Sequence, residues 1–331
     1  MSLARPRVAI IGGGIGGLFA ANAMIAHGLD VSVYEQAPEL GEIGAGFYVT
    51  PNSVRHLQRV GLGDEVEKWG ALVGEGSQYL RHDGSPIAPV QVTDATGWNA
   101  TYGMHRADFV DLLAAGLPDG VVHCGYRGAG FEQSDDTARV TFENGAEVEA
   151  DVVVAADGIH STLRPSVFPP STPVFHGTIS YRGLVAREKI PDWPVDRWLM
   201  WAGPSKHFLV FPETGITTAD IVLQTGNGEE ILVIGQGANQ AIEDGMALAV
   251  ILSQTDKSSA PAALLAYEKL RRERVAEVQL GARQNGLRVD SMSKYTDLKL
   301  RDTELTNHAE FRKHLYAYDV LPEAEAAAAS L

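Results

Sequence analysis

The chain has 331 residues, of which 45% are hydrophobic and 21% are charged, and its formal net charge at pH 7 is -15. This acidic balance, without a dense block of lysine and arginine, argues against a protein that binds nucleic acid by neutralising phosphates. The single cysteine, Cys124, excludes an intrachain disulfide and fits a reducing cytoplasm, and the absence of clustered histidine and cysteine predicts no metal site.

The first part of the chain predicts a strand, a glycine-rich turn, a helix and a second strand. Residues 7–11 are a short apolar run, GGGIGG follows from Gly12, residues 18–26 favour a helix, and residues 29–34 favour a strand. The uncharged run after Arg7 also resembles a signal peptide or a membrane span, but its cluster of glycines would weaken a membrane helix. We therefore expect the start of a nucleotide-binding domain, with no membrane segment.

The turn fits G-x-G-x-x-G at Gly12, Gly14 and Gly17. The first glycine permits a sharp turn, the second lets the backbone approach a pyrophosphate, and the third lets helix and strand pack closely. Glu35, which follows Gly17 by eighteen residues, is placed to bind both hydroxyls of a ribose and disfavours a 2'-phosphate. This context predicts FAD or NAD rather than NADP; the alternative is a glycine-rich turn without a ligand.

A second junction of strand and turn occurs in the middle of the chain. Residues 149–156 (EADVVVAA) indicate one buried strand, which runs into Asp157 and Gly158. Ser161 can cap the helix that follows. A plain turn accounts for Asp157 and Gly158 without a ligand, but it accounts less well for Arg164.

A third junction begins at the apolar run 231–234, which indicates a buried strand. A Gly-Gln-Gly turn follows, and an amphipathic helix is expected to begin near Asn239. Glu243 and Asp244 then fall early in that helix, where acids suit the helix dipole. Such a junction is suited to bind an anion or a flat ring.

The remainder of the chain predicts helices. Residues 261–287 favour one long helix, and we expect its charged run 269–274 (KLRRER) to be a solvated face. Residues 288–331 also favour helix, with a frayed alanine-rich end at 324–329.

Five motifs in order give the chain a more specific resemblance. These are GGGIGG with Glu35, Gly44-Ala45-Gly46 with Pro51-Asn52, His105-Arg106-Ala107-Asp108, ADGIHSTLR, and GQGANQAIEDG. Together they resemble the single-component FAD-dependent aromatic hydroxylases, which include salicylate hydroxylase, 3-hydroxybenzoate 6-hydroxylase and 6-hydroxynicotinate 3-monooxygenase. The similarity continues through YAYDVLPEAEA and so covers nearly the whole chain.

The resemblance implies an α/β fold, in which a Rossmann-like FAD-binding domain is interleaved with a smaller β-sheet substrate domain and followed by a helical C-terminus. We expect the FAD-binding domain to comprise residues 1–72, 102–172 and 230–287. The substrate domain would comprise 73–101 and 173–229, and the C-terminal helical segment 288–331.

The resemblance also implies cofactor contacts. Glu35 would hold the adenosine ribose of FAD, and Arg106 would lie along the ribityl-pyrophosphate region, unless it is only a surface arginine at a helix start. Asp157 and Gly158 belong to a motif that family members use for both FAD and the nicotinamide cofactor. The expected cofactor-binding residues are Gly12, Gly14, Gly17, Glu35, Ala45, Gly46, Arg106, Asp157, Gly158, Gly237, Ala238 and Asn239, the last three approaching the isoalloxazine ring.

One expected feature of the family is missing. Family members carry Gly-Asp at the end of the last strand, roughly ten residues before the Gly-Gln-Gly turn, whereas here Gly235 meets Gln236 directly. Only twenty-three residues separate Pro212 from Gln236, too few for the elements that relatives hold there. A deletion, an edited sequence or the omission of mobile residues would each explain this. We expect the last of these, and hence a break in the backbone between Pro212 and Gly237 beside a poorly ordered flavin site.

The reaction implied by the resemblance is hydroxylation of a small aromatic acid of the hydroxybenzoate, salicylate or hydroxynicotinate type. NADH or NADPH would reduce FAD, dioxygen would form a flavin hydroperoxide, and the ring would attack its distal oxygen. Other possibilities on the same scaffold are an FAD-dependent epoxidase or dehydrogenase, or a flavin-binding protein without catalysis.

The protein would have to deprotonate the ring hydroxyl, and a histidine suits that role. His207, at the start of the predicted strand 208–212, occupies a place where relatives carry a histidine; some add a tyrosine four residues on, where this chain has Phe211. The alternative is a strand-edge histidine without a catalytic task. Arg182 would either bind a substrate carboxylate bidentately or stabilise the sheet. The expected catalytic residues are His207, Tyr181, Arg182 and Gln236.

Overall fold

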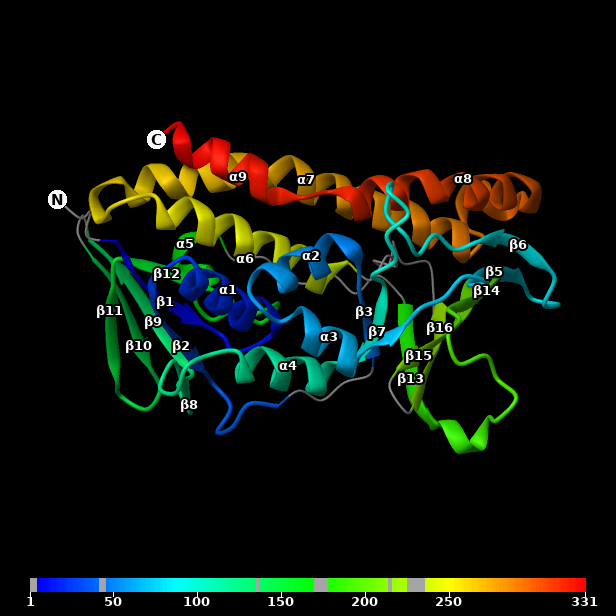
Figure 1. Cartoon of the computed structure of the whole chain (residues 1–331), viewed down its shortest axis with the longest axis horizontal. Helices are drawn as coiled ribbons and strands as arrows, with labels where there is room; N and C mark the ends of the chain where they lie inside the picture. The colour runs from blue at the N-terminus through cyan, green and yellow to red at the C-terminus, as the bar shows by residue number, and fades with distance from the viewer. Residues whose placement is uncertain (1–4, 42–45, 135–136, 170–177, 214–215, 225–235) are drawn as a thin grey trace.

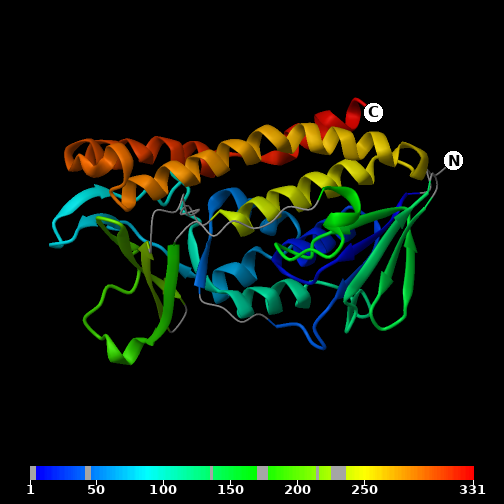
Figure 2. The ribbon, with the colours of Figure 1, turned by 180° about the vertical axis from the view of Figure 1, so that it is seen from behind.

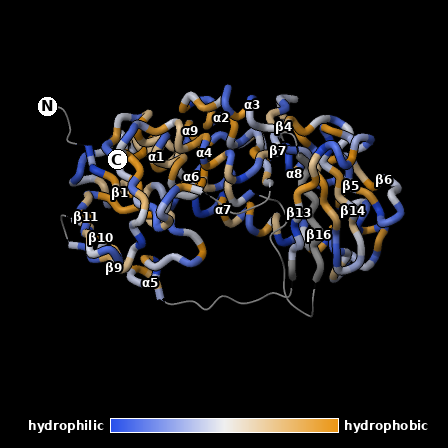
Figure 3. The backbone as a smooth tube through the Cα atoms, turned by 90° about the horizontal axis from the view of Figure 1, so that it is seen from below, coloured by the Kyte–Doolittle hydropathy of each residue, from blue (hydrophilic) through white to orange (hydrophobic). Residues whose placement is uncertain are grey.

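The computed structural model describes residues 5–41, 46–134, 137–169, 178–213, 216–224 and 236–331. Two regions rich in strands lie at opposite ends of an elongated molecule, and long helices run between them (Figures 1 and 2). Hydrophobic stretches of the backbone gather around β1, α1 and α6 in the larger region (Figure 3). The arrangement confirms the predicted α/β fold.

The larger region is built on a parallel sheet with strand order β12-β1-β2-β8. Its strands are β1 (Arg7–Ile11), β2 (Asp30–Glu35), β8 (Val122–Cys124) and β12 (Val152–Ala155). Parallel neighbours need a crossover, and α1 (Ile15–Ala26) supplies the one between β1 and β2. The N-terminus of α1 therefore lies at the carboxyl edge of the sheet, as the glycine motif predicts.

The predicted single strand 149–156 was wrong in extent, because two strands occupy this segment. β11 (Glu147–Ala150) joins an antiparallel sheet with β10 (Ala138–Phe142) and β9 (Gly128–Gln133), whereas β12 joins the parallel sheet. The break falls at Asp151, whose carboxylate accepts a hydrogen bond from the backbone N–H of Arg7 at 2.9 Å and pairs with Lys257 at 2.9 Å. The Asp151 side chain, which is bound by Arg7 and Lys257, therefore lies where the chain passes from the antiparallel sheet to the parallel sheet.

The smaller region is a six-stranded sheet with order β13-β16-β15-β14-β5-β6. Its strands are β5 (Gln78–Arg81), β6 (Pro86–Pro89), β13 (Thr178–Ala186), β14 (Leu199–Gly203), β15 (Lys206–Glu213) and β16 (Ile216–Gln224). β15 contains the predicted strand 208–212. The predicted segments 73–101 and 173–229 thus contribute to one sheet, while the exact domain limits stay a prediction.

A short sheet joins the two regions. It contains β3 (Gly46–Val49), β7 (Tyr102–His105) and β4 (Ala71–Leu72). A Cβ atom on Gly103 would overlap the carbonyl oxygen of Pro212, and one on Gly46 would overlap Glu213. Glycine at these two positions lets the short sheet approach β15 of the six-stranded sheet.

The long helices of the last part of the chain run along the side shown uppermost in Figure 1. The long helix α7 (Ala260–Val289) confirms the predicted helix 261–287, and α8 (Leu298–Ala317) and α9 (Val320–Ala329) follow. The remaining helices are α2 (Pro51–Arg59), α3 (Gly63–Trp69), α4 (Arg106–Ala115), α5 (Arg164–Val167) and α6 (Gly237–Ser253). Within the described ranges we find no helix whose length and apolar character would allow it to span a bilayer.

The expectation of a frayed alanine-rich end was wrong. Ala324 is fully buried and Ala328 is 6% exposed, and both belong to the main hydrophobic core. Small side chains allow α9 to pack closely, and this packing stabilises a segment whose sequence suggests fraying.

The charged run 269–274 is not simply a solvated face, and that expectation was also wrong. Arg271 and Arg274 are 3% and 6% exposed, and their guanidinium groups lie 2.9 Å and 3.3 Å from the carboxylate of Glu243, which is fully buried. Arg271 also lies 2.6 Å from Asp244. Burial lowers the pKa of Arg271, but the carboxylates of Asp244 and Glu243 outweigh this effect and hold it above its ordinary value. Because α6 begins at Gly237, these acids lie beyond its first turn and serve as partners of α7.

Glu243→Gln should lower the free energy of unfolding by about 3–5 kcal/mol, because it leaves two buried arginines without their shared charge. Urea denaturation without cofactor measures this. Glu277→Gln is the control, because Glu277 pairs with Arg274 at 3.6 Å but its side chain is 44% exposed; it should cost less than about 1 kcal/mol. Equal effects of the two substitutions would contradict a special role for the buried pair.

Candidate functional site

A cavity of about 680 Å³ opens at the carboxyl edge of β1 and β2. It is the place where ligands bind in open α/β sheets. Three segments separated in the sequence line it, and they include the first and second predicted junctions: residues 11–14, 34–41 and 156–162, with Val110 and 126–128 alongside. The fold therefore brings the glycine motif, Glu35, Asp157 and Gly158 to one cavity.

The physical reason for a glycine differs among the three motif positions. Gly12 has φ +117°, and a Cβ atom there would overlap the carbonyl oxygen of Ala156. A Cβ atom on Gly17 would overlap the carbonyl oxygen of Gly12. A Cβ atom on Gly14, by contrast, would meet no described atom within 4 Å. Packing explains Gly12 and Gly17, whereas the open space at Gly14 fits a ligand that approaches the backbone closely.

Two carboxylates border this cavity. Glu35 accepts hydrogen bonds from the backbone N–H of Gly13 at 2.6 Å and of Ala37 at 2.8 Å. Asp157 accepts a hydrogen bond from the N–H of Thr162 at 2.8 Å, but its Oδ1 is buried without a partner among the described residues. An unsatisfied buried acceptor costs about 1–3 kcal/mol, so a bound hydroxyl donor would relieve it. These acceptors, together with the open Gly14 at the start of α1, fit the phosphates and ribose of a dinucleotide.

The predicted flavin turn lies at the N-terminus of α6 and is fastened to β3. Asn239 accepts a hydrogen bond from the N–H of Thr50 at 3.0 Å and donates one to the carbonyl of Tyr48 at 2.9 Å. Gln236 is 5% exposed and donates to Thr50 Oγ1 at 3.2 Å. The side chain of Gln236 is therefore engaged by the protein, and the structure does not bring it to His207.

The other residues predicted to bind the cofactor differ in their location and burial. Arg106 is the first residue of α4, and its guanidinium lies 6.0 Å from the ring centroid of Phe47. Gly46 starts β3 and is buried, whereas Ala45 lies outside the described residues. Gly237 is exposed and Ala238 is half-buried at the start of α6.

His207 lies on β15 and is 3% exposed. Its Nδ1 lies 2.7 Å from Oδ1 of Asp290, the residue that ends α7. Alternation along the strand places Leu209 and Phe211 on the same face as His207. Phe211 packs on Tyr48 of β3 with ring centroids 4.5 Å apart. The face that carries His207 therefore continues to the strand that holds the start of α6.

Tyr181 and Arg182 are exposed residues of the edge strand β13. Through β16, the strand register aligns Arg182 with Leu209 and Tyr181 with Phe208. Residues aligned across a sheet share a face. Arg182 therefore lies on the face of His207, whereas Tyr181 lies on the opposite face.

Sequence reasoning missed the partner of His207 and the residues that hold the predicted flavin turn. Asp290 lies 83 positions from His207 and no motif surrounds it. Asn52 was visible only as part of the Pro-Asn motif, yet it is fully buried and donates to Glu243 at 2.7 Å.

The predicted break between Pro212 and Gly237 stays a prediction. The structure describes 216–224 of this segment as β16, but 214–215 and 225–235 lie outside the described residues. The predicted strand 231–234 falls within that second range.

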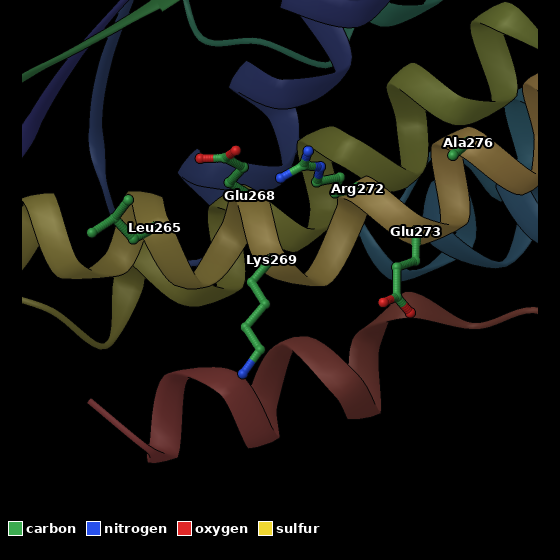
Figure 4. Close-up of a pocket in the computed structure, with 6 residues that line it drawn as sticks. All are labelled: Leu265, Glu268, Lys269, Arg272, Glu273 and Ala276. Carbon is green, nitrogen blue, oxygen red and sulfur yellow. The ribbon is translucent and has the colours of Figure 1, made fainter.

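Another hollow of about 530 Å³ has no relation to these motifs. All six residues that line it belong to α7, and their side chains spread to both sides of that helix (Figure 4). A hollow along one helix, bordered by charged side chains such as Glu268, Lys269 and Arg272, does not enclose a ligand.

Comparison with known proteins gives consistent results. The family model for the FAD binding domain matches residues 5–230. The chain is 31% identical to a 3-amino-4-hydroxybenzoate 2-monooxygenase of Streptomyces platensis, covering 85% of this chain and 88% of the relative. It is 31% identical to a 6-hydroxynicotinate 3-monooxygenase of Bordetella bronchiseptica over 64% of this chain and 56% of the relative. The structure of a salicylate hydroxylase substrate complex superposes with a TM-score of 0.81 at 22% identity, covering 98% of both chains, which shows the fold.

The Streptomyces alignment also shows that this chain is shorter inside the matched region. It extends over 350 positions, whereas 85% of 331 residues is about 281 residues. About 70 aligned positions, the difference between 350 and 281, therefore have no counterpart in this chain.

Gly14→Ala should weaken FAD binding at least about tenfold, because the methyl group would occupy space next to the pyrophosphate. Thermal unfolding without FAD should hardly change. Gly17→Ala is the matched comparison and should destabilise the protein without FAD by about 1–3 kcal/mol through overpacking. Titration with FAD, followed by flavin fluorescence, and thermal melts give both quantities. A Gly14→Ala protein that melts early but binds FAD normally would assign Gly14 to packing instead.

Proposed function

The chain belongs to the single-component FAD-dependent aromatic monooxygenases, and from this premise we propose that it hydroxylates a small aromatic acid of the hydroxybenzoate, salicylate or hydroxynicotinate type. FAD is its cofactor, NADH or NADPH is its electron donor, and dioxygen is its second substrate. The observation that carries the proposal is that Gly14, with its open Cβ position, Glu35 and Asp157 line one cavity.

We assign the cofactor contacts as follows. The turn from Gly12 to Gly17 and the start of α1 would hold the pyrophosphate, Glu35 the adenosine ribose, and Asp157 a hydroxyl group. The start of α6 would adjoin the flavin ring, and Arg106 the ribityl-pyrophosphate region. When bound, FAD accepts a hydride from the nicotinamide and activates dioxygen for transfer to the substrate ring.

His207 is proposed to accept the proton of the ring hydroxyl, which leaves the ring electron-rich. The surrounding side chains support this role because Leu209 and Phe211 make the same face apolar, and an apolar site excludes water. Arg182 shares the face and is proposed to bind the substrate carboxylate. Geometry supports Tyr181 and Gln236 less, since one lies on the opposite face and the other is bonded to Thr50.

Two broader expectations remain part of the proposal. The division into an FAD-binding domain and a substrate domain is supported by the two separate regions of strands. A cytoplasmic location is supported by the single cysteine.

A second candidate function is a flavin-binding protein without hydroxylase activity. It is favoured by one observation, the roughly 70 aligned positions that the chain lacks relative to the Streptomyces enzyme. Loss of elements near the substrate would leave the cavity for the dinucleotide in place.

A substrate panel separates the two functions. The protein is saturated with FAD and supplied with NADH or NADPH and, in turn, 3-amino-4-hydroxybenzoate, salicylate and 6-hydroxynicotinate, with benzoate as the control without a hydroxyl group. We expect one hydroxylated acid to stimulate oxidation of the nicotinamide cofactor and to gain one labelled atom from ¹⁸O₂. Flavin binding without stimulation by any acid would favour the second candidate, and absence of flavin binding would contradict both.

His207→Ala should retain FAD binding but lower hydroxylation by about 10²–10⁴-fold, the usual contribution of general-base catalysis. Oxidation of NADH or NADPH should continue and release peroxide, because flavin reduction does not require this base. The ratio of product to oxidised cofactor measures the effect. Full coupled turnover would reduce His207 to a structural residue of its strand.

A further inference from the structure

We propose that Asp290 is a positioning residue for His207: it fixes the imidazole so that Nε2 is the nitrogen that accepts the proton of the substrate. This inference rests on the proposed role of His207 as the base. It adds a residue from the end of α7 to a site otherwise built from strands.

The contact itself is short and buried. Nδ1 of His207 lies 2.7 Å from Oδ1 of Asp290, and the two side chains are 1% and 7% exposed. A second bond joins the same segments, because the N–H of Ser205 donates to the carbonyl of Asp290 at 2.7 Å. With Nδ1 donating to the carboxylate, the lone pair of the ring is on Nε2.

The position of Asp290 is unfavourable without such a partner. A helix C-terminus carries partial negative charge, so a carboxylate that caps it is repelled. Burial adds a desolvation cost that a buried charge must offset by pairing. The nearby arginines have other carboxylates, since Arg301 bonds to Asp302 at 2.7 Å and Arg288 to Glu304 at 3.2 Å. Among the described residues, His207 is the side chain within hydrogen-bonding distance of the Asp290 carboxylate.

The backbone around the pair is strained. Ser205, Ser291 and Ser293 have φ of 53°, 52° and 53°, and they are the non-glycine residues with positive φ that the described chain contains. One precedes His207 by two positions, and the others follow Asp290 by one and three. Such strain costs about 1–3 kcal/mol per residue and persists where the surrounding structure fixes it, most often at functional sites. Arg301 holds Ser291 in place by donating to its Oγ at 2.9 Å.

The proton transfer follows from this geometry. The O–H bond of the ring hydroxyl breaks, its proton moves to Nε2, and its electron pair stays on the phenolate oxygen. Asp290 stabilises the imidazolium that forms and keeps the ring from rotating. The proton then leaves Nε2 for solvent before the next turnover.

Asp290→Asn tests the proposal. We expect FAD affinity and the rate of substrate-stimulated NAD(P)H oxidation to stay within about threefold, while the product formed per cofactor oxidised falls at least about tenfold. The KM for the acid should change less than the kcat for formation of the hydroxylated product. A fluorinated analogue of the best acid from the panel, with fluorine beside the hydroxyl, ionises more readily and should recover most of the loss. Unchanged coupling in Asp290→Asn, or a loss that the fluorinated acid does not reduce, would overturn the proposal.

The control is Asp302→Asn, which removes a neighbouring carboxylate that contacts Arg301 and Arg81 but not His207. It should leave coupling unchanged; a loss as large as that of Asp290→Asn would overturn the assignment. If Asp290→Asn alone does not fold, His207→Gln/Asp290→Asn, which keeps an amide–amide hydrogen bond, is compared with His207→Gln. Equal coupling in these two proteins supports the proposal, and a further tenfold loss in the double variant overturns it.

The same series separates this inference from the proposed function. Full coupling in both His207→Ala and Asp290→Asn would reject the base itself. Loss of coupling in His207→Ala with full coupling in Asp290→Asn would retain the base and reject its positioning by Asp290.

Discussion

The buried charge of Glu243 is the constraint on which much of the structure depends. Its carboxylate accepts hydrogen bonds from Arg271 and Arg274 of α7 and from Asn52 of α2. A carboxylate without solvent must be compensated on every side, so the three helices are fixed around it. Separate bonds of Asn239 with Tyr48 and Thr50 hold the start of α6 to the end of β3, and Asn52 links the two sets because it also donates to Gln236, the residue before α6. The proposed site for the flavin ring is therefore connected to the ion cluster around Glu243.

The sequence predicted the parts of the fold whose cause is local. The dinucleotide motif was recognised because each glycine and Glu35 has a role that can be derived from a strand, a turn and a helix. The strand β1 and the long helix α7 follow from periodicity. Prediction from the sequence failed where the partners of a side chain come from distant segments of the chain. Arg271 and Arg274 look like solvated charges until Glu243 is placed beside them, and nothing near Asp151 in the sequence shows that Arg7 and Lys257 will bond to it.

The candidate site shows the same division. His207 was proposed through resemblance, whereas Asp290 gives no local signal, because its contact with His207 spans 83 positions of the sequence. Assigning Tyr181 and Arg182 to the two faces of the sheet required the strand register, because a shift by one residue would exchange their faces. The open space at Gly14 and the crowded space at Gly17 likewise distinguish two glycines that the motif treats alike.

The long helix α7 connects two parts of the structure. Arg271 and Arg274, near its middle, contact Glu243, and Asp290, at its C-terminus, contacts His207. From Arg274 to Asp290 an α-helix rises roughly 24 Å at about 1.5 Å per residue. The length of this helix therefore sets the distance between the ion cluster around Glu243 and the proposed base, His207. It also sets the rotational phase, because one inserted residue would turn Asp290 by about 100° away from His207. In related chains, length changes in this helix should then occur in whole turns, whereas the loops beside it are free to vary.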